Sequence, residues 1–318
     1  MYYETGGPDV FRYEDVPDPN IGPGDLLVEV DAISIEGGDT LNRLRGDMSR
    51  TPHVVGYQCA GRVAESGSAL IGFGVGDPVV TVGLDGSHAA LRAVPGAFAW
   101  KVPDGLSLRE AACVPVPFGT AHDCLFEFGR LTAGETALIH AGASGVGVAA
   151  IQMAKRAGAH VLATASSDEK LDRLVELGLD GGINYVRSDF VAEVRRLTEG
   201  RGADVVVDSV GGTTLQGSLA SLAYRGRCVT VGDAGRLAAE TLDISNLRPN
   251  NQSLSGYFLG AELLLGSRAH PMISGLLDDI ARGELRVVID REYPLAEAGA
   301  AHAYIESRQS FGRVLLVP

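Results

Sequence analysis

The middle of the chain alternates short apolar runs with amphipathic stretches. Residues 136–140 and 160–165 are apolar runs of the length of buried strands, and the segment between them, 148–157, has the pattern of a helix that ends at Gly158. A glycine-rich turn with the spacing Gly-x-x-Gly-x-Gly joins the first run to this helix. These features predict a βαβ unit whose glycines lie at the first turn.

The same alternation continues to about residue 255. Apolar runs at 182–185, 204–208 and 227–231 are separated by segments with helical periodicity. Strands that are apolar throughout are typical of a parallel sheet with helices on both faces. We therefore expect a doubly wound α/β domain, in which ligands bind at the carboxyl ends of the strands.

The first hundred residues show a different pattern. Short strand-like segments between glycine and proline turns are expected at 10–16, 25–32, 54–65, 78–82 and 88–94. Such a series predicts a partly open β-barrel. Two prolines then interrupt a short helix, and a further helix is expected at 119–128.

The glycine-rich turn is the strongest candidate for a binding site. Glycines let the backbone approach a pyrophosphate, and the N-terminus of the following helix offers unpaired N–H groups and the positive end of its dipole. The usual order Gly-x-Gly-x-x-Gly is absent, so a purely structural turn is the alternative. The flanking strands and helix favour a dinucleotide, and we expect it to contact Ala143, Ser144, Gly145 and Val146.

The end of the second strand indicates which dinucleotide. A NAD site would carry Asp or Glu there, whereas this chain has Ser166 and Ser167, followed by Asp168 and then Lys170. Hydroxyl groups and a lysine suit a 2′-phosphate, which favours NADPH, and Tyr185 after the third strand is expected beside the adenosine phosphate. The alternative is that one of the serines only caps the next helix.

Further candidate contacts follow the later strands. Ser209 and Val210 come after the run 204–208, and Gly232 comes after the run 227–231. Because the carboxyl ends of parallel strands share one edge, we expect these residues to contact the cofactor. The alternative is that the glycines after Val210 simply begin a helix.

Length, charge and cysteines narrow the class of protein. The 318 residues suggest two domains, and the net charge of −13 argues against nucleic acid or an anionic membrane as a partner. The first residues lack the pattern of a signal peptide, and no run has the roughly 18 apolar residues of a membrane span. The four cysteines are scattered, so we expect reduced thiols and a cytoplasmic protein.

Taken together, the segments resemble a known family along nearly the whole chain. The matching segments are GGPDVFRYEDVPDP, GYQCAGRV, KVPDGLSLREAAC, ALIHAGASGVGVAAIQMAK, TASSDEKL, INY, DVVVDSVGG and YPLAEAGAAHAYIESRQSFGRVLLV. Their order and spacing resemble the zinc-free quinone oxidoreductase (zeta-crystallin-like) branch of the medium-chain dehydrogenase/reductase superfamily.

The resemblance implies an α/β fold with two domains. A GroES-like, partly open β-barrel domain would comprise residues 1–118 and be completed by 256–318, and it would carry the substrate and catalytic residues. A doubly wound Rossmann domain with a parallel sheet would comprise 119–255 and bind NADPH. The resemblance also implies a homodimer, paired through the edge segment 253–259.

The resemblance points to an enzyme without zinc. Zinc-dependent relatives supply Cys, His and Glu from two segments, which here read Glu-Gly-Gly-Asp at 36–39 and Gly-Tyr-Gln at 56–58. The metal ligands are missing, so we expect no metal. Relatives usually have Asn at the position of Glu36 and an apolar pair in place of the two glycines, which puts the substrate contacts in doubt.

The resemblance also implies roles for individual residues. Thr120 would face the nicotinamide, Tyr57 would donate a hydrogen bond to a substrate carbonyl or pack in the barrel, and Asp39 would orient the site. Arg313, at a position where relatives have lysine, and Phe258 would contact the cofactor.

The expected activity is hydride transfer from NADPH to a small-molecule quinone. One alternative is a reductase that acts on the activated double bond of an enone, an enal or an enoyl thioester. An alternative of another class is a redox sensor that binds NADPH with little turnover.

Overall fold

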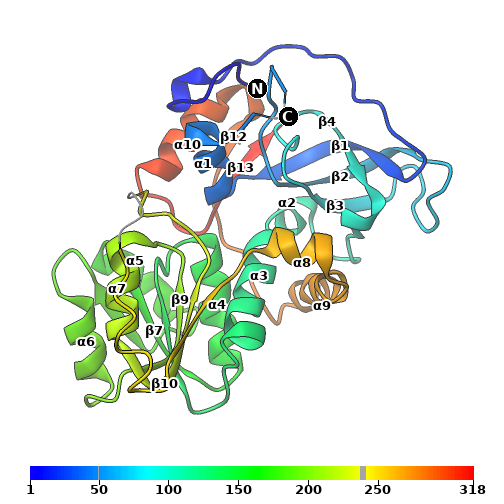
Figure 1. The fold of residues 1–318 in the computed structure, drawn as a ribbon. Coiled ribbons are helices and arrows are strands. Elements are labelled where there is room, and N and C mark those ends of the chain that lie inside the picture. Colours follow the sequence, from blue (N-terminus) through cyan, green and yellow to red (C-terminus); the bar gives the residue numbers. More distant parts are fainter. Residues whose placement is uncertain (49, 237–240) are drawn as a thin grey trace. The chain divides into compact units, whose positions relative to one another are not determined.

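Figure 1 shows the computed structural model, which describes residues 1–48, 50–236 and 241–318. The chain forms two compact units. We call residues 1–119 with 259–318 the barrel unit, and residues 120–258 the Rossmann unit.

The barrel unit is built on a mostly antiparallel sheet. Its strands are β1 (Asp25–Ser34), β2 (Gln58–Ser66), β3 (Pro78–Val82), β4 (Leu91–Pro95), β5 (Ala99–Lys101), β12 (Ile289–Pro294) and β13 (Arg313–Val317). They lie in the order β12-β13-β1-β2-β3-β5, and β4 also pairs with β1. Strand β1 therefore joins the first part of the chain to its last strand, with Ile33 opposite Leu316.

Helices connect the strands of this unit, and α2 and α10 pack against the sheet. They are α1 (Gly37–Arg45), α2 (Leu108–Ala111), α8 (Leu259–Leu265), α9 (Ala269–Ala281) and α10 (Ala298–Glu306), with short 3₁₀ turns at Pro8–Val10, Gly96–Phe98 and Leu295–Glu297.

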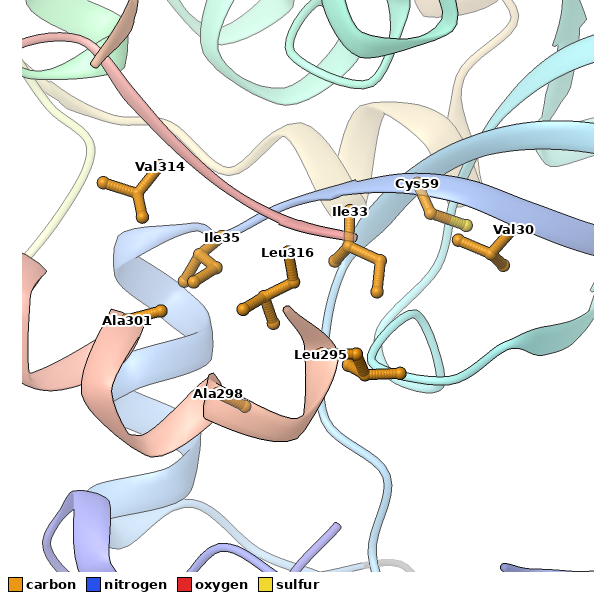
Figure 2. Packing of buried hydrophobic residues seen from close by; sticks show 9 residues of the cluster. All are labelled: Val30, Ile33, Ile35, Cys59, Leu295, Ala298, Ala301, Val314 and Leu316. Atoms are coloured by element: carbon orange, nitrogen blue, oxygen red, sulfur yellow. The ribbon is translucent and has the colours of Figure 1, made fainter. Parts of the chain in front are cut away.

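A hydrophobic cluster fastens the C-terminal segment to the barrel. Figure 2 shows Leu316 of β13 between Ile33 and Ile35, at the end of β1, and the side chains of α10. Ile33, Ile35 and Leu316 are at most 2% exposed. Burial of each such side chain contributes about 1.5–3 kcal/mol, so residues far apart in the sequence stabilise one another here.

The Rossmann unit is built on a parallel sheet. Its strands are β6 (Thr136–Ile139), β7 (His160–Ala165), β8 (Gly181–Asn184), β9 (Ala203–Asp208), β10 (Leu222–Thr230) and β11 (Ser253–Gly256). Their order is β11-β10-β9-β6-β7-β8. The strand order reverses between β6 and β9, and ligands of such sheets bind at this point, beyond the carboxyl ends of the strands.

The helices of this unit follow the strands in alternation. They are α4 (Gly145–Arg156), α5 (Asp168–Val175), α6 (Phe190–Leu197) and α7 (Gly212–Ala220), and α3 (Pro115–His122) with a π-helical turn at Asp123–Phe128 precedes β6. The strands are buried as their apolar runs predicted, with Leu138, Leu162 and Val206 at 0% exposure in one cluster.

One expected strand is wrong, and one expected helix begins earlier than predicted. Residues 11–16 form no strand, because the nearby prolines lack N–H groups for a ladder. Arg12 exchanges two hydrogen bonds with Met1, from Arg12 N–H to Met1 O (2.8 Å) and from the Met1 amino group to Arg12 O (3.1 Å), but this pairing is not continued as a ladder. Residues 119–128 are helical as expected, but the helix begins at Pro115, and its last part, Asp123–Phe128, is a π-helical turn. Prolines are tolerated in the first turn of a helix, where N–H groups have no intrahelical acceptor.

In the part of the chain that the structure describes, every helix is too short or too polar to cross a lipid bilayer.

Candidate active site

The glycine-rich turn presents the N-terminus of α4. Ser144 caps this helix, since its Oγ accepts a hydrogen bond from the Gly147 N–H (3.1 Å). The helix begins at Gly145, three residues before the predicted start. The first N–H groups of an α-helix lack intrahelical acceptors, so Gly145 and Val146, with Ala143 in the turn before them, lie where a phosphate would bind.

Two glycines make this turn possible. A Cβ on Gly142 would lie 2.9 Å from both Ala163 Cβ and Leu174 Cδ1, and a Cβ on Gly147 would lie 2.4 Å from Ala141 O. Both positions therefore need glycine for close packing of helix, turn and strand. Packing alone accounts for these two glycines, whereas the N–H groups at the start of α4 are the feature that fits the pyrophosphate of a dinucleotide.

A buried hydrogen-bond chain ties three strand ends together beneath the turn. His140 Nδ1 lies 3.1 Å from Thr164 Oγ1, and His140 Nε2 lies 3.0 Å from Ser218 Oγ. Ser218 Oγ lies 2.7 Å from Asp208 Oδ2, and Asp208 Oδ1 accepts the N–H of Val210 (2.8 Å). All four linking side chains are at most 2% exposed. The chain fixes the ends of β6, β7 and β9 relative to one another.

The charge state of this chain follows from its burial. Burial lowers the pKa of His140, so the imidazole is neutral at pH 7 even though Asp208 raises that pKa. The carboxylate of Asp208 is the strongest acceptor near Ser218, so the serine hydroxyl donates to it. His140 Nε2–H then donates to Ser218, and His140 Nδ1 accepts the hydroxyl proton of Thr164.

The loops after β9 and β10 lie against each other. The N–H of Gly235 donates to Val210 O (2.8 Å), and a Cβ on Gly232 would lie 2.9 Å from Ser209 O. Gly211 has a φ of +71°, which favours glycine at this position. The structure thus brings Ser209, Val210 and Gly232 together at the carboxyl edge that also carries the glycine-rich turn.

The ends of β7 and β8 carry the residues predicted to select the nucleotide. Ser167 caps α5, since its Oγ accepts the N–H of Lys170 (3.3 Å), so the capping alternative holds for this serine. Tyr185 follows β8, is 40% exposed, and donates its N–H to Ala165 O (3.2 Å). Ser166, Ser167, Lys170 and Tyr185 therefore lie together at neighbouring strand ends.

An arginine that the sequence analysis missed lies at the same place. Arg187 forms an ion pair with Asp168, which also accepts a hydrogen bond from Asn184 Nδ2 (2.6 Å). The acidic group at the start of α5 is thus neutralised by a cation two residues beyond Tyr185. No local pattern links positions 168 and 187, because the pair forms only when β8 lies beside β7.

Two more predicted residues belong to the Rossmann unit. Thr120 is 5% exposed on α3, and Phe258 is 56% exposed just beyond β11.

The barrel unit contains a buried ion pair next to Tyr57 and Asp39, two of the predicted catalytic residues. The guanidinium of Arg313 contacts the carboxylate of Glu36 and donates to Ser34 Oγ (2.6 Å) and to Ile35 O (2.6 Å). Gln58 Nε2 donates to the same Glu36 oxygen (2.5 Å). Arg313 was predicted to contact the cofactor. Its guanidinium is instead buried against the end of β1 and the two residues that join β1 to α1.

Asp39 is also buried, and its carboxyl group links Glu36 to Tyr57, the residue before β2. One of its oxygens accepts the Glu36 N–H (2.8 Å) and the other accepts the Tyr57 N–H (3.1 Å). Burial raises the pKa of Asp39 to about 8, against these hydrogen bonds, and raises the pKa of Glu36 to about 7, against Arg313. These bonds hold the Asp39 carboxyl group between the backbones of Glu36 and Tyr57.

The phenol of Tyr57 lies beside the first two turns of α1. Its oxygen accepts a hydrogen bond from Asn42 Nδ2 (3.1 Å), which leaves the hydroxyl proton for another acceptor. Burial raises the pKa of Tyr57 to about 12, so the phenol is neutral at pH 7. Asn42 was not identified from the sequence, because its role depends on the turn of helix that brings it to Tyr57.

Comparison with known proteins places this arrangement in a family. Residues 22–104 match the alcohol dehydrogenase GroES-like domain, and residues 145–276 match the zinc-binding dehydrogenase domain. A quinone oxidoreductase of Pseudomonas aeruginosa is 32% identical, over 98% of this chain and 97% of that protein. The chain belongs to the zinc-free quinone oxidoreductase branch of the medium-chain dehydrogenase/reductase superfamily.

Two further similarities extend over nearly the whole chain. A 2-haloacrylate reductase of Burkholderia sp is 34% identical, over 100% of this chain and 98% of that protein. The crystal structure of the Escherichia coli quinone oxidoreductase complexed with NADPH has a TM-score of 0.93 and 28% identity, over 100% of this chain and 98% of that one. The predicted family and the predicted fold class, a GroES-like barrel and a doubly wound Rossmann sheet, are confirmed.

One of the two matching domains is described as a zinc-binding dehydrogenase. The side chains of this chain do not fit a zinc ion. The carboxylate of Glu36, at a position where zinc-dependent relatives supply a ligand, is bound by Arg313 and Gln58. A guanidinium cation there leaves the carboxylate unsuited to a metal. Within residues 1–48, 50–236 and 241–318, no three His, Cys, Asp or Glu side chains gather as a metal site would require.

Proposed function

We propose that this protein is an NADPH-dependent oxidoreductase that transfers hydride to a quinone. The observation that carries the proposal is the phenol of Tyr57, which is neutral and is held by Asn42 with its proton available to a carbonyl oxygen. The similarity to quinone oxidoreductases, one of them complexed with NADPH, supports it.

The Rossmann unit would hold the cofactor. The N-terminus of α4, from Ala143 to Val146, suits the pyrophosphate, and the loops with Ser209, Val210 and Gly232 supply further contacts. Thr120 and Phe258 are proposed contacts of the same cofactor. When bound, NADPH supplies the hydride.

The barrel unit would orient and activate the acceptor. Hydride addition to a quinone or to a conjugated double bond places negative charge on a carbonyl oxygen. A hydrogen-bond donor aimed at that oxygen stabilises the charge. We assign this donor to Tyr57, with Asp39 holding its backbone and Asn42 its phenol oxygen.

A second candidate function is the reduction of an activated alkene. The similarity to 2-haloacrylate reductase favours it, and the same phenol would serve an unsaturated carbonyl acceptor. The test is NADPH consumption by the purified protein with 1,4-benzoquinone, a linear α,β-unsaturated ketone and 2-chloroacrylate in parallel. Fastest turnover of benzoquinone supports the quinone assignment. Fastest turnover of either alkene replaces it, and tight NADPH binding without turnover would favour a redox sensor.

We propose that Lys170 and the serines at the end of β7 select NADPH over NADH. Replacement of Lys170 by alanine is expected to weaken NADPH binding about 10- to 100-fold, because a charge-assisted hydrogen bond contributes about 1.5–3 kcal/mol. Binding of NADH should not change. Fluorescence titration with both nucleotides measures this, and Lys101→Ala in the barrel unit controls for the lost charge. Equal weakening for NADPH and NADH would contradict the assignment.

We also propose that the protein is a cytoplasmic homodimer. Strand β11 ends the Rossmann sheet and, among the described residues, pairs on one side only, so a second copy has an edge to extend. The four cysteines are buried and free, which suits a reducing compartment. Light scattering should give the mass of two chains, and the mass of one chain would refute the pairing.

A further inference from the structure

The ring of Tyr57 occupies the space where a side chain at position 38 would lie. A Cβ built on Gly38 would be 2.4 Å from Tyr57 Cε2, 2.7 Å from its Oη and 2.8 Å from its Cζ. Real Cβ atoms do not approach other atoms this closely. A Cβ built on the neighbouring Gly37 would meet nothing within 4 Å. Two adjacent glycines of one helix therefore have opposite surroundings.

Side chains of the same helix bind both the backbone and the phenol of Tyr57. The backbone N–H of Tyr57 donates to Asp39 Oδ1, and its phenol oxygen accepts from Asn42 Nδ2, each over 3.1 Å. Gly38 and Asn42 are four residues apart, so they lie on one face of α1. The ring thus lies against Gly38, with the bond to Asn42 one turn further along the helix.

We propose that Gly38 is a positioning residue for Tyr57. Without a side chain at position 38, the ring lies directly on the helix backbone, and the phenol reaches Asn42. This contact sets the direction in which the hydroxyl proton is presented. The inference rests on the proposed function, in which that proton meets the carbonyl oxygen of the acceptor.

A side chain at position 38 is incompatible with Tyr57 in its present place, whereas one at position 37 has open space. Gly38 and Tyr57 therefore form a complementary pair, whereas Gly37 is not needed for it.

The test compares Gly37→Ala with Gly38→Ala in the full-length protein. Both changes replace glycine by alanine in the first turn of α1, so helix propensity changes alike. Gly38→Ala is expected to lower kcat/KM for 1,4-benzoquinone at least tenfold, with the Kd for NADPH unchanged, and Gly37→Ala should stay within twofold of the parent. In a Tyr57→Phe background, Gly38→Ala should cause less than a twofold further loss, because the hydroxyl is already gone.

A readout without turnover separates this inference from the proposed function. With 3-fluorotyrosine incorporated, the ¹⁹F resonance assigned to Tyr57 by its loss in Tyr57→Phe should shift in Gly38→Ala and not in Gly37→Ala. This result would support the positioning role even if no acceptor is reduced. An unmoved resonance, or a loss in the double variant equal to the product of the two single losses, would overturn it.

A second variant covers the case in which Gly38→Ala fails to fold. Tyr57→Ala removes the ring that the new methyl group would meet, so Gly38→Ala/Tyr57→Ala should fold with a Tm close to that of Tyr57→Ala alone. A double variant that remains unfolded would show that the ring is not the obstacle and would refute the pairing.

Discussion

Replacement of Tyr57 by phenylalanine is expected to lower kcat/KM for 1,4-benzoquinone on the order of 100-fold, because the loss of one donor at a developing oxyanion typically has an effect of this size. The ring and its packing against Gly38 remain, so the Tm and the Kd for NADPH should stay close to those of the parent. Steady-state kinetics and nucleotide titration measure the three quantities. Tyr13→Phe, at an exposed tyrosine of the barrel unit, is the control.

The pH dependence adds a second check on Tyr57. Because burial raises the pKa of Tyr57 to about 12, its hydroxyl stays protonated across the range in which most enzymes are assayed. Ionisation of the phenol should therefore not change kcat/KM between pH 7 and 9, so a change in that range is expected to follow Asp39, whose pKa is about 8. A decline in that range that persists in Asp39→Asn and disappears in Tyr57→Phe would mean that the phenol ionises there, and full activity of Tyr57→Phe would return the residue to a packing role.

Replacement of Arg313 by methionine should destabilise the protein by about 3–5 kcal/mol, the usual effect of removing one partner from a buried ion pair. Glu36 would remain 5% exposed, with Gln58 as its hydrogen-bond donor but without its cation. Urea denaturation measures the loss, and Arg196→Met, at an exposed ion pair of the Rossmann unit, should leave the midpoint almost unchanged.

The sign of the pH dependence follows from the buried carboxyl group. Burial already raises the pKa of Glu36 to about 7 in the folded protein, and loss of Arg313 raises it further. The folded state of Arg313→Met therefore binds a proton that the unfolded state releases, and its stability falls as the pH rises through that pKa. The destabilisation should be larger at pH 8 than at pH 6, and Glu36→Gln/Arg313→Met should recover part of it. Equal losses at both pH values would contradict a buried charge as the cause.

The regular parts of the fold were predictable because their signal is local. The apolar runs at 78–82 and 160–165 coincide with β3 and β7, and the glycine-rich turn lies where the pattern placed it. Buried strands and tight turns depend on residues that are close in the sequence, so periodicity identifies them. The predicted groups around Ser144, Ser167 and Ser209 then meet at one edge because parallel strands share it.

The less predictable features depend on contacts between distant residues. The pair of Glu36 and Arg313 joins positions 277 residues apart, and nothing near Arg313 in the sequence indicates that its guanidinium is buried. The contact of Gly38 with Tyr57 depends on the pairing of β1 with β2 and on the turn that starts α1. The sequence identified Tyr57 and Asp39 only through the resemblance, and the side chains that hold them appeared only with the fold.

The hydrogen-bond chain beneath the glycine-rich turn has a direction. Each hydroxyl in it donates once, so every proton from Thr164 through His140 and Ser218 points toward Asp208, whose carboxylate has none to return. A single acceptor thereby orders the tautomer of one ring and the rotation of two hydroxyl groups, one on β7 and one on α7. These hydrogen bonds beneath the glycine-rich turn therefore form one polarised unit with a single orientation.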